Sequence, residues 1–183
     1  MMKGRVKDSA LSTGGNVTVK KIRRNAVVKT SKYNNHATSN LLYGIARFIR
    51  GDFRDFPTAS DNFLPKFLGV GIGEPADPSA SDTSLINELQ ITRRFDVVPG
   101  RVEQYQADGV IKLILTSFIT SNVVGGRELT EIGLFTSATP GQGNMLAKVN
   151  ITDESGNGQT LGSGESLQVD WEITLGNNSD LSE

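Results

Sequence analysis

Residues 153–158, Asp-Glu-Ser-Gly-Asn-Gly, are the stretch of the sequence closest to a metal-binding motif. Asp153, Ser155 and Asn157 place oxygen donors at alternate positions, and a glycine stands sixth, as at the start of a calcium-binding loop. The twelfth position is Gly164, where such a loop carries a bidentate glutamate. The stretch is therefore a weak calcium candidate, and a solvated turn is the alternative interpretation.

Residues suited to acid–base or nucleophilic chemistry are few. There is no cysteine, which excludes thiolate catalysis, disulfides and zinc–sulfur sites. The single histidine, His36, lies among polar residues just before a predicted helix, and we interpret it as a polar side chain there rather than as a ligand. Glu128 and Glu131 are close in sequence, but a carboxylate pair without a pocket, a base or a positioned arginine is not an acid–base pair. We therefore expect no catalytic residues, no cofactor and no enzymatic activity.

The glycine-rich segment Phe67–Gly73 superficially suggests phosphate binding. A dinucleotide fingerprint must open a helix, whose N-terminal amides bind the pyrophosphate. Pro75 and Pro78 follow instead, and no helix can continue through them. We predict a strand here, with glycines that leave room for a close neighbour. A loop and a short helix over about 82–89 are expected to follow.

Charge is distributed unevenly along the chain. Residues 1–32 hold nine basic residues and one acidic residue, a net charge of +8, and residues 33–183 carry −9. One interpretation is a basic N-terminal arm, residues 1–32, that grips an acidic partner and precedes a domain of residues 33–183. The other is a solvated strand pair with an apolar side. Nucleic acid is disfavoured because no aromatic residues are interleaved with the charges. The candidate interface residues are Lys20, Lys21, Arg23 and Arg24.

One principal helix is predicted over about 40–50. Its apolar residues recur with the 3.6-residue period of a single stripe, at Leu41, Leu42, Ile45, Phe48 and Ile49. Thr38, Ser39 or Asn40 can cap its start, and Gly51 follows its end. We expect the stripe to pack on the core and residues 52–65 to form an irregular surface loop.

Strand patterns dominate the rest of the chain. Leu167, Val169, Trp171 and Ile173 alternate with polar residues, which predicts a half-buried strand with Trp171 inside. Residues 110–120 are apolar on both faces, as in a central strand. Further strands are predicted over 127–135 and 145–151, and two extended segments, 91–98 and 101–106, are separated by Pro99-Gly100. The fold class is therefore mainly β with a minor helical part, an antiparallel β-sandwich with one principal helix.

The order of these segments resembles a broad group of tailed-bacteriophage virion proteins, which includes tail-fibre attachment domains and small tail, baseplate or neck proteins. The resemblance covers about residues 33–175 and depends on order rather than on one specific motif. The segments are Asn34-Asn35-x-x-Thr38, Ala46–Gly51, Leu68–Pro75, Ser81–Leu85 with Glu88, Leu89 and Arg93, Leu129–Phe135, Met145–Lys148 and the Trp171 strand. The resemblance implies a repeated structural subunit that docks onto the particle and has no catalytic residues.

We therefore expect a non-enzymatic virion structural protein, assembled in the host cytoplasm as a tail, baseplate, neck (collar) or fibre-adaptor subunit. Its expected partners are other virion proteins and further copies of itself, in a ring or in multiples of three or six. A capsid decoration protein is the alternative. A carbohydrate-binding sandwich ranks lower because Tyr33, Tyr43 and Tyr105 are scattered. No stretch approaches the roughly 20 apolar residues of a membrane span, and no secretory signal is expected at the start of the chain.

Overall fold

The computed structural model describes residues 12–49, 65–105 and 110–176, and its architecture is mainly β, as predicted. Ten antiparallel strands form one continuous sheet in the order β3-β2-β12-β7-β6-β5-β9-β10-β4, with β1 paired to the end of β12. Two very short strands, β8 and β11, pair separately. The bounds are β1 Ser12–Gly14, β2 Asn16–Arg23, β3 Ala26–Asn34, β4 His36–Ala37, β5 Phe67–Gly71, β6 Phe95–Tyr105, β7 Val110–Thr120, β8 Glu128–Leu129, β9 Glu131–Phe135, β10 Met145–Asn150, β11 Gln159–Thr160 and β12 Glu165–Gly176.

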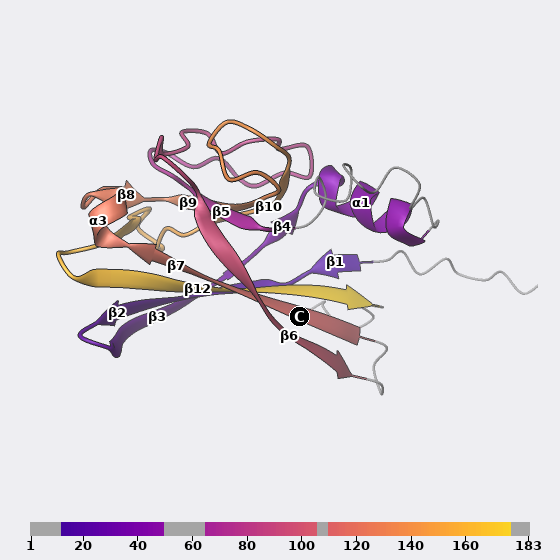
Figure 1. The fold of residues 1–183 in the computed structure, drawn as a ribbon, viewed down its shortest axis with the longest axis horizontal. Coiled ribbons are helices and arrows are strands. Elements are labelled where there is room, and N and C mark those ends of the chain that lie inside the picture. Colours follow the sequence, from indigo (N-terminus) through magenta and orange to yellow (C-terminus); the bar gives the residue numbers. More distant parts are fainter. Residues whose placement is uncertain (1–11, 50–64, 106–109, 177–183) are drawn as a thin grey trace, which may run out of the picture.

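The sheet folds over on itself into two layers (Figure 1). The first layer contains β3, β2, β12, β7 and most of β6, and the second contains β5, β9, β10 and β4. Strand β6 belongs to both, because its start pairs with β5 and the rest pairs with β7. The main apolar core combines residues of β2, β7 and β12 with residues of β5, β9 and β10, so it lies between the layers.

Strand β12 lies between β2 and β7, and its alternating pattern is confirmed. Leu167, Val169, Trp171 and Ile173 are buried in the core, whereas Gln168, Asp170 and Glu172 lie on the opposite, outer face of the first layer. Strand β7 pairs with β12 on one side and β6 on the other, as expected for a central strand. Together these strands form the framework of the first layer.

Two predicted breaks in the strands differ from the structure. Pro99-Gly100 does not separate two segments: β6 runs through it, and a shift of register between Pro99 and Val102 takes up the irregularity. A bulge of this kind lets proline lie within a strand at a position that donates no ladder hydrogen bond. In contrast, the single strand predicted over 127–135 is divided into β8 and β9, with Thr130 between them. A one-turn helix α3 (Ser121–Val124) follows β7, and Gly125 and Gly126, both at positive φ, form the turn after it.

The prediction of a short helix over about 82–89 is wrong, because no helix forms there. Residues 72–94 form an irregular loop over the outer side of the second layer, and main-chain bonds to β5 replace helical ones. Leu89 N–H donates to Val70 O at 2.8 Å, and Ile72 N–H donates to Asn87 O at 3.0 Å. The loop buries Leu85 in a second, small apolar cluster with Phe135 and Met145.

The glycines of β5 and β9 make room for this loop, as predicted for the glycine-rich strand. A Cβ on Gly69 would lie 2.8 Å from the Phe135 ring and 2.9 Å from Glu88 Oε1. A Cβ on Gly71 would lie 2.7 Å from Glu131 Cγ. Side chains of larger residues would therefore push the covering loop away from the sheet.

The principal helix, α1, spans Ser39–Ile49 and packs against β10. Leu41 is 7% exposed and Ile45 packs on the core, but Leu42 is 39% exposed, so the buried stripe is narrower than predicted. Thr38 precedes the helix: its hydroxyl donates to Met145 O at 2.7 Å, and its main-chain O accepts from Leu41 N–H at 3.1 Å. The side chains of Phe48 and Ile49, Gly51 and all but Pro65 of the predicted loop 52–65 lie outside the part of the structure that can be described.

Candidate interaction surface

Residues 16–34 form the β2–β3 hairpin, and this hairpin belongs to the sheet rather than to a separate arm. Strand β2 pairs with β12 along most of its length, and Val17 and Val19 are buried in the core. The predicted boundary between residues 32 and 33 falls inside β3. The strand pair considered as the alternative interpretation is what this segment forms, because its alternating valines complete the core. Residues 1–11 of the predicted arm lie outside the described residues.

Two of the four candidate interface residues have partners within the chain. Lys20 Nζ lies 2.7 Å from Asp170 Oδ2, and Lys21 Nζ lies 2.9 Å from Glu165 Oε2. Lys21 also donates to Thr160 O at 2.7 Å. The hydrogen bond from Lys21 is the main reason that the pKa of Glu165 lies below its ordinary value. These two lysines attach β2 to β12, so their charges are already compensated.

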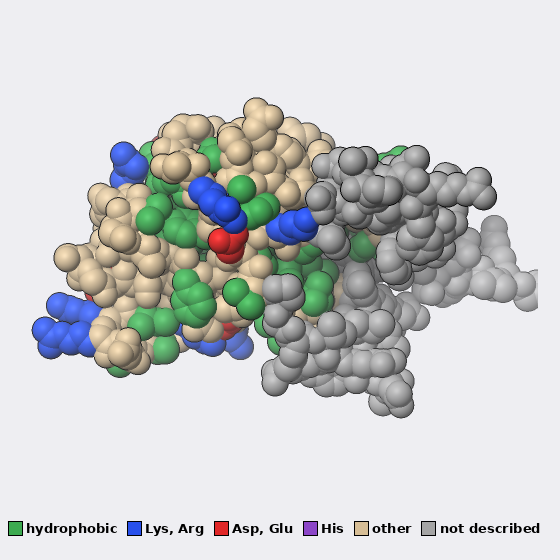
Figure 2. Space-filling view, in the orientation of Figure 1, with side chains coloured by type: hydrophobic (Ala, Val, Ile, Leu, Met, Phe, Trp, Pro, Cys, Tyr) green, Lys and Arg blue, Asp and Glu red, His purple; other side chains and the backbone are tan. Residues whose placement is uncertain are grey.

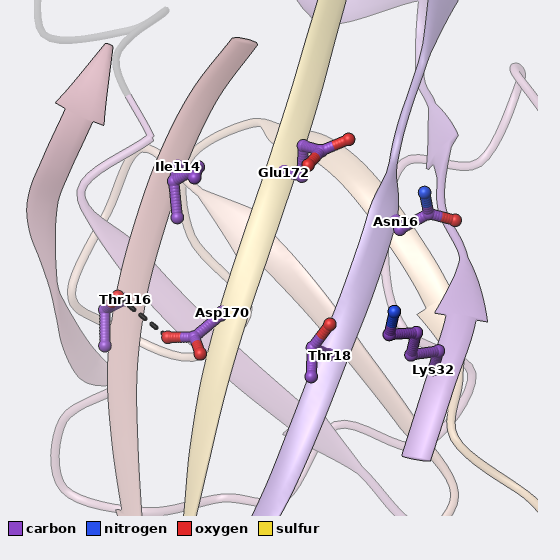
Figure 3. A pocket seen from close by; sticks show the side chains of 7 residues that line it. All are labelled: Asn16, Thr18, Lys32, Ile114, Thr116, Asp170 and Glu172. Atoms are coloured by element: carbon purple, nitrogen blue, oxygen red, sulfur yellow. Dashed lines mark hydrogen bonds between the residues drawn. The ribbon is translucent and has the colours of Figure 1, made fainter. Parts of the chain in front are cut away.

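Asp170 is the centre of a polar network on the outer face of the first layer (Figure 3). Burial works to raise the pKa of Asp170, but hydrogen bonds from Lys20, Gln168 and Thr116 outweigh it and hold the pKa below its ordinary value. Thr116 Oγ1 donates to Asp170 Oδ1 at 2.9 Å, and Gln168 Nε2 donates to Oδ1 and Oδ2 at 2.9 and 3.0 Å. A carboxylate satisfied in this way stays ionised and holds three strands together.

A shallow depression of about 380 Å³ lies beside this network. Side chains of β2, β3, β7 and β12 line it, and Figure 3 shows Asp170 between Thr116 and Thr18, with Glu172 farther along β12 between Ile114 and Asn16. Glu172 Oε1 lies 3.2 Å from Lys112 Nζ. The carboxylates are therefore paired, and the seven lining residues include no aromatic ring on which a sugar could stack.

The other two candidates, Arg23 and Arg24, lie at the tip of the hairpin. Arg23 pairs with Ala26, so the loop is the two residues Arg24 and Asn25, both at positive φ (50° and 63°). This is the geometry of a type I′ turn, which Asn favours and Arg seldom adopts. Neither arginine forms an ion pair with any described residue, and Lys and Arg side chains gather at this tip in Figure 2. The structure thus separates the four candidates into two internal anchors and two exposed cations.

The calcium candidate forms a compact turn. Asp153 Oδ1 accepts hydrogen bonds from Ser155 N–H at 3.0 Å and Asn157 N–H at 2.9 Å. These bonds, led by the one from the Asn157 main chain, lower the pKa of Asp153. The donors that hold the turn thus occupy the oxygen that a cation would need, which is the pattern of an Asx turn. Within the described residues, no cluster of three His, Cys, Asp or Glu side chains could hold a metal ion.

The remaining sequence candidates lie apart. His36 is exposed on β4 opposite Lys148. Glu128 is exposed on β8 and accepts a hydrogen bond from Gly158 N–H, whereas Glu131 is buried on β9. The two glutamates therefore do not form a pair.

A buried ionic layer beneath the 72–94 loop was missed by sequence reasoning. Lys148 Nζ lies 2.8 Å from Glu131 Oε2, outside ideal hydrogen-bond geometry, and both side chains are at most 2% exposed. Glu131 Oε1 also accepts the Ile86 N–H at 2.8 Å. Such a pair positions a segment more than it adds net stability.

A second buried pair holds the end of the same loop. Arg94 binds Glu88 through two bonds of 2.6 and 2.9 Å, and its guanidinium lies 3.6 Å from the centre of the Phe135 ring. Charged residues inside apolar strand patterns, such as Glu131 in E-I-G-L-F, were the available signal for this layer. Their partners could not be identified without the fold.

None of the helices in residues 12–49, 65–105 and 110–176 is long and apolar enough to cross a membrane. Comparison of the chain with protein-family models, with curated proteins and with solved structures found no match.

Proposed function

We propose that this protein is a non-enzymatic structural subunit of a bacteriophage virion, in the tail, baseplate or neck (collar) or as a fibre adaptor. Its partners are other virion proteins and further copies of itself. The resemblance in segment order suggests this class. The observation that carries the proposal is the separation of charge on a compact β body: the β2–β3 hairpin has six basic residues and no acidic one, and residues 73–90 have four acidic residues and no basic one.

The roles of the residues that carry the resemblance support a structural function. Glu131, Gly133 and Phe135 of the E-I-G-L-F strand and Lys148 of the M-L-A-K strand are buried under the 72–94 loop. The glycines of Leu68–Gly73 make room for the same loop. These residues hold the surface loop against the sheet and present no reacting group to solvent. A charged surface loop held in place in this way suits docking between subunits.

Mass spectrometry of purified particles of the virus that encodes this chain tests the proposal. We expect the chain in washed particles, at a copy number that is a small multiple of three or six relative to the major capsid protein. Hundreds of copies would indicate the alternative, a capsid decoration protein. Absence of the chain from particles that contain all other structural proteins would contradict a virion role.

A further inference from the structure

We propose that copies of this chain associate head to tail, with the tip of the β2–β3 hairpin of one copy docked on the acidic loop of the next. The hairpin surface consists of Arg23, Arg24, Val27, Val28 and Lys29. The loop surface consists of Glu74, Asp77 and Ile86. This inference rests on the proposed function and specifies the contact through which the subunits would assemble.

The hairpin surface projects beyond the body of the protein. The register shift between Lys21 and Ile22 leaves Val28 without a cross-strand partner, as in a β-bulge, so simple alternation does not separate Val27 from Val28. Each is 55% exposed, so neither layer covers this end of β3, and Figure 1 shows the turn between β2 and β3 at one extremity of the fold. No described strand pairs with the outer edge of β3. The tip therefore offers a narrow apolar ridge flanked by cations.

The loop surface is acidic and held in place before any partner arrives. Asn150 Nδ2 donates to Ala76 O at 2.9 Å, which ties the acidic part of the loop to β10. Ile86 is 54% exposed although its N–H is bonded to buried Glu131. The bond between Ile72 N–H and Asn87 O joins the two ends of this part of the loop, two residues before Glu74 and one residue after Ile86. The loop surface, an exposed isoleucine with carboxylates, is complementary to the hairpin surface, two exposed valines with cations. Because the loop is already held in place, little conformational entropy is lost on binding.

The charges select the symmetry of the contact. A two-fold contact between two hairpins would place Arg23, Arg24 and Lys29 against the same cations of the other copy, and a two-fold contact between two loops would oppose like carboxylates. Hairpin against loop joins opposite charges instead. The hairpin belongs to the first layer and the loop covers the second, so each copy presents both surfaces (Figure 1). Repetition of this heterologous contact produces a ring if the rotation closes.

Charge reversal of each surface tests the contact. The hairpin variant is Arg24→Asp with Lys29→Glu: Asp tolerates the positive φ at position 24, and Lys29 pairs across the strands with Lys21. Arg23 is not changed, because it lies opposite Glu165 in the pairing of β2 with β12, and an acidic residue there would oppose a carboxylate. The loop variant is Glu74→Lys with Asp77→Lys. Arg127→Glu, an exposed reversal on neither surface, is the control, and circular dichroism with thermal unfolding verifies that every variant is folded.

Self-association is measured by sedimentation velocity of the purified full-length chain at low ionic strength. We expect at least a tenfold weaker association for either reversed variant and wild-type behaviour for Arg127→Glu. The chain that carries both reversals, and an equimolar mixture of the two variants, should recover association. Added salt should weaken it, because exposed charges are screened.

Several results would overturn the inference. They are a wild-type chain that stays monomeric at the highest soluble concentration, reversed variants that associate normally, or a doubly reversed chain that stays defective. Dimers formed by the hairpin variant with wild type, and no larger species, would indicate a two-fold hairpin contact instead. In each case the chain could still be found in particles, so failure of this contact and failure of the virion role are distinguishable.

Discussion

Trp171 is the largest side chain in the core and is 1% exposed, in the middle of β12. Trp171→Ala should lower the free energy of unfolding by about 3–5 kcal/mol, because it leaves a cavity between the layers. Trp171→Phe should cost clearly less, since the indole N–H has no hydrogen-bond partner to lose. Chemical denaturation followed by circular dichroism measures both. An equal loss of unfolding free energy in the Ala and Phe variants would mean that the stability does not depend on how much of the space between the layers the side chain fills.

A substitution at Gly69 tests how closely the 72–94 loop packs on β5. Gly69→Ala should destabilise the fold by about 1–3 kcal/mol, because the new methyl group meets the Phe135 ring and Glu88. Gly162→Ala is the matched control: its Cβ would come no closer than 3.4 Å to the flexible end of Glu165. Thermal unfolding of the two variants provides the comparison, and a tolerated Gly69→Ala would mean that the loop can shift at little cost.

For single residues, the local sequence pattern predicts which side chains face the core, but it does not predict which residues form ion pairs. The inward orientation of Trp171 follows from alternation within one strand. The partner of Lys20 is Asp170, 150 residues away, and the partner of Lys148 is Glu131 on the neighbouring strand. Both pairings depend on strand register, which a single sequence does not specify. Lys20 and Lys21 share one basic run with Arg23 and Arg24, but the fold gives the two pairs different roles.

Helix α1 provides two adjacent leucines with different environments. Leu41→Ala should cost about 2–3 kcal/mol, because Leu41 is buried in the core, whereas Leu42→Ala should cost less than about 1 kcal/mol. Equilibrium unfolding in urea distinguishes them. A larger loss for Leu42 would place its side chain in a contact beyond the described residues.

The attachment of the hairpin to β12 should depend on pH through Asp170. Its pKa is lowered in the folded state, so its stabilising effect is present above the unfolded value near 3.9 and is lost as pH falls below it. Asp170→Asn should therefore lower stability by about 1 kcal/mol at pH 7, and the difference from wild type should shrink below about pH 4. Lys20→Met should remove much of the same pH-dependent difference. Unfolding curves between pH 3 and 7 measure it, and a constant difference would exclude this linkage.

Element types were predictable where the apolar period was long, as in β7, β12 and α1. The helix predicted over 82–89 does not form, because main-chain bonds to β5 determine the conformation there. The prediction also failed at Pro99-Gly100, where the long pairing of β6 with β7 overrides a turn-forming dipeptide. In both cases hydrogen bonds to a distant strand outweighed local propensity.

At the scale of the whole molecule, the first thirty residues separate into two parts that deletion can distinguish. Removal of residues 1–32 takes away β2, exposes the edge of β12 and removes Val17 and Val19 from the core, so the remaining chain should be insoluble or unfolded. Removal of residues 1–11 leaves every described strand intact and should preserve the cooperative unfolding transition. Circular dichroism and expression in the soluble fraction test this, and a folded 33–183 fragment would contradict the assignment of β2 to the framework of the sheet.

The pairing of β1 with the end of β12 determines how the fold would respond to a mechanical load. Ser12 lies opposite Gly176, and Gly14 lies opposite Thr174, so the first and last described strands leave the body side by side. Tension applied between these two points would act across the strands and open their hydrogen bonds one pair at a time, rather than shear many bonds together. Resistance to pulling from the two ends should therefore be low. A subunit of this build that works under tension would need to receive the force through its lateral surfaces.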